Sequence, residues 1–308
     1  MYNRGDYVKL LVDSETGEVT ENIASWRTEK QQEAWQNIKD YKKKQEEKEY
    51  AKMMGMKGMN PEYKEFGPFL FLVFSKVEEL FPNLNNKSIS MLIMLSSFLD
   101  YNNNLIKTSG QPMLRKDLAR ILDTSESSVS RFVHALKSEK ILVVNNDGTM
   151  KINDERIYRG HIKTNLNRTS YTTTRIYINS CRELYYSCDK KNRSKLSYVY
   201  RLLPWINLEH NVLCWNPDEE DLEKLELMSI GDYAEEIGFG RENSTKLSKE
   251  LFSFKLYNKP VILLVYSGDI KKASVLINPS LLYSGSNVGG MRVFFNAQAD
   301  KEEEKKNK

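Results

Sequence analysis

The chain has 308 residues, of which 40% are hydrophobic, enough for two domains of ordinary size with cores of their own. No apolar run approaches the roughly 18 residues of a membrane span, and the N-terminus lacks the apolar segment of a secretion signal, so we expect a cytoplasmic protein without membrane contact. The net charge is only +4, but residues 84–201 are basic and residues 202–285 acidic, as expected if one region alone touches nucleic acid.

Residues 1–65 are expected to form an N-terminal hairpin and a charged helical arm. Residues 7–21 read as strand, turn and strand around the polar segment DSETG. Residues 28–54 are dense in Lys, Glu and Gln with a thin apolar edge, which favours a solvated helix over a nucleic-acid arm because the charges nearly cancel. A Met- and Gly-rich connector follows at residues 53–61.

Residues 66–165 are predicted to form a first winged helix. Residues 66–81 are strongly apolar and aromatic, so we expect them to be buried in this domain or in a dimer interface. Residues 88–100 predict the first helix of the domain, and residues 105–107 a short strand.

The stretch 114–153 has the order of elements of a winged helix-turn-helix. Apolar residues at helical spacing predict a short helix that ends at Leu122, and the polar turn DTS follows, where Thr124 or Ser125 can cap a second helix. That helix repeats Val129, Phe132, Val133 and Leu136 on one stripe. The strand ILVV, the turn NNDG and the strand MKIN then predict a hairpin, the wing.

The face of this second helix opposite the apolar stripe is predicted to read DNA. Small hydroxyls at the helix start allow close approach to a phosphate, and Arg131 and His134 are long enough to reach base edges in a major groove. The alternative is an ordinary α+β core whose outer face is merely solvated. The candidate DNA-binding residues are Ser127, Ser128, Ser130, Arg131, His134, Lys137, Arg115, Lys116, Asn146 and Lys151.

Residues 166–195 are predicted to be a basic connector in which lysines and arginines alternate with tyrosines. Residues 171–178 alternate like a strand, and a helix broken at residues 189–192 is expected up to Trp205. Two interpretations remain open, a segment that tracks phosphates beside the first wing and a solvated link between domains.

An internal repeat predicts a second winged helix at residues 196–290. NDERIYRG at 153–160 resembles NPSLLYSG at 278–285, Asp117-Leu118-Ala119 matches Asp232-Tyr233-Ala234, and Ser90 with Asn104-Leu105 matches Ser197 with Asn211-Val212. The fold class is therefore expected to be mainly α with small β-wings, an α+β protein with two tandem winged helix-turn-helix domains.

The second copy is acidic, which favours dimerisation or partner binding over a main DNA contact. Its helix after the turn still displays a second set of candidate DNA contacts, and residues 291–308 are expected to form a flexible tail. The second set is Arg241, Thr245, Lys246 and Lys249.

Catalytic and metal-binding motifs are not found in the sequence. There is no phosphate-binding GxxxxGK[ST] loop, nucleophile elbow or HExxH, and the three histidines are far apart. Three cysteines without a CxxC spacing argue against disulfides and against a standard zinc site. We therefore expect a protein that is not an enzyme and uses no cofactor or metal.

Three motifs resemble the RepL-type replication proteins of small plasmids from low-GC Gram-positive bacteria. They are the opening DSETGEVTE, the helix-turn-helix stretch 114–153 and NDERIYRG after it. That family shares an acidic D-E-S/T-G-E-V start and an N-P-x-L-x-x-x-G end after the wing, where this chain has Asp154 in place of proline. The likeness covers about the first 160 residues. The tandem arrangement separately resembles two-winged-helix plasmid initiators, in which one domain reads DNA and the other can support dimerisation.

The resemblance implies origin or operator binding in a plasmid, phage or other mobile element. By position, it assigns the recognition helix Ser127, Ser128, Ser130, Arg131 and His134. The leading hypothesis is a replication initiator that binds double-stranded DNA as a homodimer, associates with the nucleoid or plasmid, and engages host replication proteins. The alternatives are a transcriptional repressor of a phage or plasmid, which needs the same DNA contact, and an adaptor whose winged helices bind proteins.

Overall fold

The structure is a computed structural model that describes residues 11–12, 19–20, 66–75, 81, 83–152, 155–160, 171–266, 273–285 and 295–296. The chain divides into two compact units, residues 1–61 and 62–308. In the first unit β1 (Leu11–Val12) pairs antiparallel with β2 (Val19–Thr20), which confirms the predicted hairpin. The charged helix and the connector predicted at residues 28–61 lie outside the described residues.

The second unit consists of two halves with similar orders of elements. The first half, residues 66–160, contains β3 (Phe69–Ser75), α2 (Asn86–Ser96), η2 (Arg115–Asp117), α3 (Leu118–Ile121), α4 (Glu126–Ser138), β4 (Leu142–Val144), β5 (Met150–Ile152) and β6 (Ile157–Tyr158). The second half, residues 171–285, contains β7 (Tyr171–Tyr177), α5 (Ile178–Ser187), η3 (Arg193–Leu196), α6 (Ser197–Tyr200), η4 (Leu203–Trp205), η5 (Leu222–Lys224), α7 (Ile230–Glu236), η6 (Arg241–Asn243), α8 (Ser244–Ser253), β8 (Lys255–Leu256), β9 (Lys259–Pro260), β10 (Ile262–Tyr266), β11 (Ala273–Ile277) and β12 (Leu282–Tyr283). The described part thus holds seven α-helices and small antiparallel sheets, in agreement with the expected α+β class.

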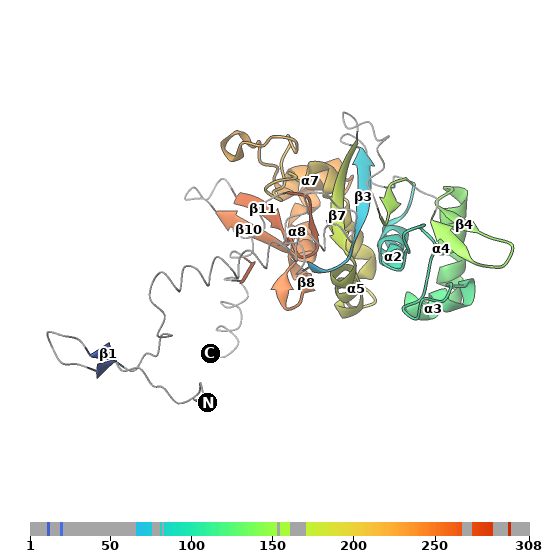
Figure 1. Ribbon diagram of the computed structural model, residues 1–308. Helices are drawn as coiled ribbons and strands as arrows, with labels where there is room; N and C mark the ends of the chain where they lie inside the picture. Colours follow the sequence, from blue (N-terminus) through green and yellow to red (C-terminus); the bar gives the residue numbers. More distant parts are fainter. Residues whose placement is uncertain are drawn as a thin grey trace, which may run out of the picture. The chain divides into compact units, whose positions relative to one another are not determined.

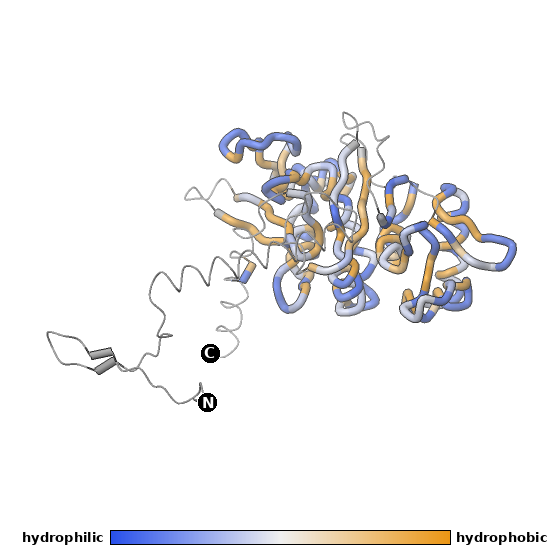
Figure 2. The backbone as a smooth tube through the Cα atoms, viewed as in Figure 1, coloured by the Kyte–Doolittle hydropathy of each residue, from blue (hydrophilic) through white to orange (hydrophobic). Residues whose placement is uncertain are grey.

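A four-stranded antiparallel sheet joins the halves in the order β12-β7-β3-β6. Its centre is the pairing of β3 with β7, which runs over seven residue pairs from Phe69↔Tyr177 to Ser75↔Tyr171. Helices α2, α3 and α4 lie to one side of these two strands and α7 and α8 to the other (Figure 1). Figure 2 shows the hydrophobic character of β3 and the hydrophilic loops at the periphery. The predicted burial of the aromatic run is confirmed for β3, which is covered within this chain.

The segment expected to be a connector, residues 166–195, instead includes β7 and α5. β7 is an inner strand, since it has β3 on one side and β12 on the other. Its sequence YTTTRIY contains few aliphatic residues, which is why composition alone suggested a link. The predicted strand and the helix broken at 189–192 are present, because α5 ends at Ser187 and η3 begins at Arg193.

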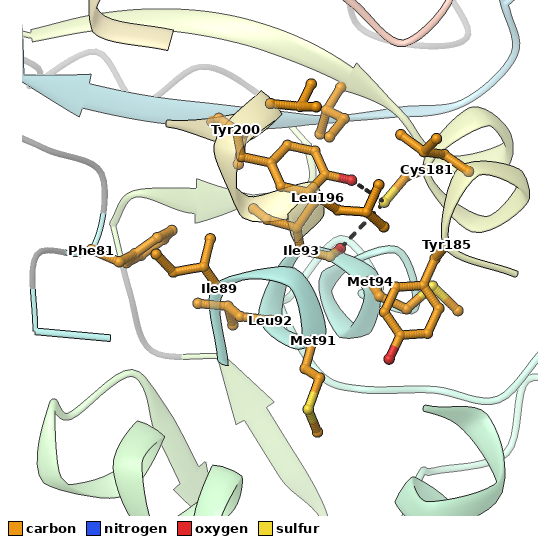
Figure 3. Close-up of a cluster of buried hydrophobic side chains, with 14 of the residues drawn as sticks. Phe81, Ile89, Met91, Leu92, Ile93, Met94, Cys181, Tyr185, Leu196 and Tyr200 are labelled. Atoms are coloured by element: carbon orange, nitrogen blue, oxygen red, sulfur yellow. Dashed lines mark hydrogen bonds between the residues drawn. The ribbon is translucent and has the colours of Figure 1, made fainter. Parts of the chain in front are cut away.

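Helix α2 is the core element between the halves. It begins after Asn85, whose side chain caps Ser88 N, and all its residues from Ser88 to Ser96 are buried. It packs against α5, η3 and α6 of the second half. Figure 3 shows its apolar side chains beside Leu196, Tyr200 and Cys181, with the Cys181 thiol hydrogen-bonded to Ile93 O at 3.6 Å. Burial raises the pKa of the Cys181 thiol to about 12, so this thiol stays protonated and serves packing.

The two halves repeat the hydrogen bonds that hold their outer strands. Asn103, at φ 62°, donates from Nδ2 to Ile157 O at 3.2 Å, and Asn211, at φ 53°, donates to Leu282 O at 3.0 Å. Ile157 pairs with Leu72 of β3 in the first half, and Leu282 pairs with Ile176 of β7 in the second. The equivalent of Asn211 is therefore Asn103, one position before the residue that the sequence repeat paired with it.

The segments from η2 to α4 and from α7 to α8 repeat in the same way. The carboxylate of Asp117 caps Leu114 N at 2.9 Å, as that of Asp232 caps Ser229 N at 3.0 Å. The following turns close with Thr124 N to Ala119 O at 3.0 Å and Phe239 N to Ala234 O at 2.8 Å. Both turns contain a left-handed residue, Asp123 at φ 45° and Gly238 at φ 69°. The repeat inferred from sequence is therefore present in the backbone hydrogen bonding.

Two short features differ between expectation and structure at the C-terminal end. Phe295, within the predicted flexible tail, is buried against Val212 and Leu276, and Lys259 Nζ donates to Asn296 Oδ1 at 2.6 Å. Phe295 precedes the charged run of residues 300–308, and its apolar ring accounts for the burial. Among the described residues, no helix has the length and apolar character needed to cross a bilayer.

We expect Ile93→Ala to lower the free energy of unfolding by about 2–5 kcal/mol, because it leaves a cavity in the fully buried α2 core between the halves. Urea unfolding followed by circular dichroism and by tryptophan fluorescence measures this. One shared transition is expected with both probes, since the halves share this core. The matched control is Ser138→Ala at an exposed position of α4, which should change stability by less than about 0.5 kcal/mol. Two separate transitions would show that the halves unfold independently.

Candidate nucleic-acid interface

Helix α4 forms where the sequence predicts it and presents a polar face outward. Ser125 is its N-cap and accepts a hydrogen bond from Ser128 N at 3.3 Å. Its buried stripe is the predicted one and packs on α2 and α3. The buried side chains are Val129, Phe132, Val133 and Leu136.

The outer face of α4 carries cations and hydroxyls. Arg131 Nε reaches Ser127 O of its own helix at 3.4 Å, which leaves the rest of the guanidinium directed to solvent. The acidic residues of this segment lie at its two ends, Glu126 in the first turn of α4 and Glu139 at the C-cap. The exposed residues of the face are Ser127, Ser130, Arg131, His134 and Lys137, as the periodicity predicts.

Ser128 differs from the prediction that it is a DNA contact. It is only 8% exposed, and its Oγ accepts hydrogen bonds from Lys87 Nζ at 2.9 Å and from Ser125 Oγ at 3.1 Å. The position lies next to the buried stripe, and the helix turns it toward α2. Ser128 therefore supports the start of α4 and does not belong to its outer face.

The segment before the turn adds a cation to the start of α4. Arg115 Nη2 donates to Ser130 Oγ at 2.9 Å, so these two predicted residues are brought together. Lys116 is exposed beside it. Burial tends to raise the pKa of Asp117, but the hydrogen bond from Leu114 N and the nearby Lys107 ammonium, at 3.1 Å, lower it overall. Asp117 thus stays ionised as a structural cap.

The hairpin β4–β5, which was predicted to be a wing, places its two candidate residues differently. Asn146 is exposed in the turn between β4 and β5, whereas Lys151 is half-buried on β5. The turn also holds Asp147, whose carboxylate accepts from Thr149 Oγ1 at 2.7 Å and from Thr149 N at 2.9 Å. These hydrogen bonds lower the pKa of Asp147, so a negative charge persists at the tip of the hairpin. The exposed Asn146 therefore suits contact with a phosphate better than Asp147 does.

Helix α8 corresponds to α4 but has a mixed outer face. Its buried Leu247 and Leu251 match Phe132 and Leu136, at the same sequence offset that relates Ala119 to Ala234. Lys246 therefore stands where the first half has Arg131. Thr245, Lys246 and Lys249 are exposed, as predicted.

Acidic side chains surround this second set. Arg241 is exposed but paired with Asp232 at 2.6 Å and Glu235 at 3.5 Å. Glu250 of α8 pairs with Lys195 at 2.6 Å. Local carboxylates therefore reduce the positive field that Arg241 would offer a phosphate, in contrast with the outer face of α4.

One cluster of charges at the start of α4 was not predicted as a site. Lys190 and Arg193, which the sequence placed in the connector, reach across to Asp123 at 2.6 and 3.1 Å. The hydrogen bond from Lys190, and then that from Arg193, hold the pKa of Asp123 below its usual value. The alternation of cations between residues 163 and 195 was the only sequence signal, and it did not show that they meet the turn before α4.

The comparisons with known proteins found no matching family model, curated protein or solved structure. Within the described residues, no group of three or more His, Cys, Asp or Glu side chains could hold a metal ion.

We expect Asp123→Asn to change how stability depends on pH. The folded pKa of Asp123 is lowered, so its carboxylate contributes stability above its ordinary pKa of about 3.9, and this contribution is lost as the pH falls through the lowered value. Urea unfolding between about pH 2.5 and pH 7 measures it. The variant should be less stable than the native chain near neutral pH and approach it at the acid end. Asparagine tolerates the positive φ at this position, so the turn is kept.

The control for this experiment is Asp189→Asn, which removes an exposed carboxylate that makes no ion pair among the described residues. A difference between native chain and Asp123→Asn that is the same at every pH would show that the ion pairs with Lys190 and Arg193 contribute nothing.

Proposed function

We propose that the protein binds double-stranded DNA in a sequence-specific manner through the outer face of α4. The observation that carries this proposal is the run of exposed Ser127, Ser130, Arg131, His134 and Lys137 along one 13-residue helix, without a carboxylate among them. An α-helix fits the major groove of B-DNA, where an arginine can bond a guanine edge with two hydrogen bonds. Arg115 and Lys116 beside the helix start suit the flanking phosphates.

We further propose that each half is a winged helix-turn-helix and that the two form a tandem pair. In each half a short helix, a turn with a residue at positive φ and a second helix follow in this order. The hairpin β4–β5 comes next in the first half, and the short hairpin β8–β9 and then β10–β11 in the second. The second hairpin, β10–β11, has a register of five residue pairs against three in β4–β5. A hairpin after the recognition helix is the usual place of a wing, which supports this interpretation for both halves.

The biological role that we propose is replication initiation for a plasmid, phage or other mobile element, with a second copy of the chain and host replication proteins as partners. It is supported by the motif resemblance to RepL-type proteins. Transcriptional repression at an operator requires the same DNA contact. Maintenance of an origin-bearing plasmid in cells that supply this protein in trans would separate the two roles.

A protein-binding role for the second half is favoured by one exposed loop. Trp215 and Leu222 are 46% and 60% exposed in a segment rich in carboxylates, residues 215–226. Exposed large apolar side chains are typical of partner surfaces, and the negative charge disfavours DNA there. A chain that had no affinity for any duplex at low salt would support an adaptor in place of a DNA reader.

Arg131→Ala is expected to weaken binding to a duplex selected from random sequence by about 1–3 kcal/mol and to relax base choice at one position. Fluorescence anisotropy with the selected duplex and with single-base variants measures both effects. Arg131→Lys is the matched variant, because it keeps the charge and loses the two-pronged hydrogen bond. It should retain the salt dependence of binding but lose the base preference. Unchanged selectivity in both variants would exclude α4 as the reading helix.

A further inference from the structure

A cleft of about 620 Å³ lies at the N-terminal end of α4, where the first half meets the second. The first half contributes the start of α2, the turn before α4 and the first turn of α4. The second half contributes α5, the loop after it and η3. The charged and hydroxyl-bearing residues that matter here are Lys87, Ser125, Ser128, Lys190, Lys191 and Arg193.

The cleft has four cations and a single carboxylate on its wall. The carboxylate, Asp123, is engaged by Lys190 and by Arg193. Arg193 is only 8% exposed, and its guanidinium also donates to Cys188 O at 3.3 Å and lies over the Tyr185 ring at 4.7 Å. These contacts hold the Arg193 guanidinium in one position on the wall of the cleft.

Two further cations of the cleft carry charge that is not neutralised. Lys87 and Lys191 are exposed and make no ion pair within the part of the chain that the structure describes. Lys87 Nζ is held by Ser128 Oγ at 2.9 Å, which points the ammonium at the first turn of α4. The two lysines come from different halves, since one lies on α2 and the other just before η3.

Hydrogen-bond donors accompany this charge. Thr124 and Ser128 bring hydroxyls to the cleft, whereas the Ser125 hydroxyl is engaged with Ser128. Apolar Met91 and Leu122 form part of the wall. The first turn of α4 adds backbone N–H groups and the positive end of the helix dipole. Several fixed donors beside excess positive charge suit an oxyanion with two charges better than a carboxylate with one.

We propose that this cleft is a phosphate site whose ligand is held jointly by Lys87 and Lys191 and so bridges the two halves. The phosphoryl group has two candidate sources. One is the backbone of a duplex bound to α4, and this source rests on the proposed function. The other is a free phosphate ester, for which the volume is sufficient because ligand pockets span roughly 300–1,000 Å³.

The test uses the full chain, its Lys87→Gln/Lys191→Gln variant and a control that makes the same charge change elsewhere, Lys140→Gln/Lys224→Gln. Lys140 lies beyond the other end of α4, and Lys224 lies in the acidic loop. All four lysines are exposed, so the fold should be kept. Calorimetry with inorganic pyrophosphate measures the free ligand, with and without duplex present. Anisotropy with the selected duplex between about 50 and 200 mM salt measures the backbone contact.

Pyrophosphate should bind the native chain and the control alike, and on the order of tenfold to a hundredfold more weakly to Lys87→Gln/Lys191→Gln. If duplex blocks pyrophosphate and the salt slope of duplex binding falls by about 2 in this variant, the backbone is the natural source. If the salt slope of duplex binding falls in this variant but pyrophosphate does not bind the native chain, the DNA backbone is again the source. If pyrophosphate also binds the duplex complex, the source is a free phosphate ester.

The proposal is overturned if Lys87→Gln/Lys191→Gln matches the control in both pyrophosphate affinity and salt slope. Failure of the proposed function looks different. In that case the native chain binds no duplex, while pyrophosphate binding still depends on the two lysines, and the phosphate site stands.

Discussion

The pairing of β3 with β7 is the constraint on which the rest of the unit depends. It joins segments that are about one hundred residues apart, with seven consecutive residue pairs. Helices α2, α3 and α4 of the first half lie to one side of these two strands, and α7 and α8 of the second half lie to the other (Figure 1). Helix α2 then fills the space between the halves and is buried along nearly its whole length. A sheet and a helix shared in this way make the two outer helices, α4 and α8, parts of one body.

Local periodicity allowed the helices and hairpins to be predicted, because each depends on residues close in sequence. The caps and stripes of α4 and α8 follow from side chains within about four positions of one another. The partner of β3 could not be predicted, since the sequence of β7 is polar and shows no preference among distant strands. For the same reason a central strand was mistaken for part of a connector. The exposed face of α4 was predicted from its stripe, but the burial of Ser128 depends on Lys87, a contact across 41 positions.

The two halves share their backbone hydrogen bonds but differ in the charge of their outer surfaces. Asn103 and Asn211 each donate a hydrogen bond to a carbonyl of an outer strand. Asp117 and Asp232 each accept one from the backbone N–H three residues earlier, so the two halves share the same backbone conformation at these points. The outer positions have diverged. Arg241 stands where the first half has Glu126, and it is paired with Asp232 and Glu235. Charge can change at such positions without cost to the fold, because they lie outside the shared core.

The inner position of β7 has a consequence for any fragment that contains the first half alone. Removing residues beyond 160 would leave β3 with an open edge of seven residues, since β6 pairs only with Phe71 and Leu72 on the other side. Unpaired edges of this kind attract other strands. Because antiparallel strands are compatible with two-fold symmetry, two such fragments could restore the sheet by joining edge to edge. The full chain is in this sense a covalently fused dimer, and the fusion makes strand pairing independent of protein concentration.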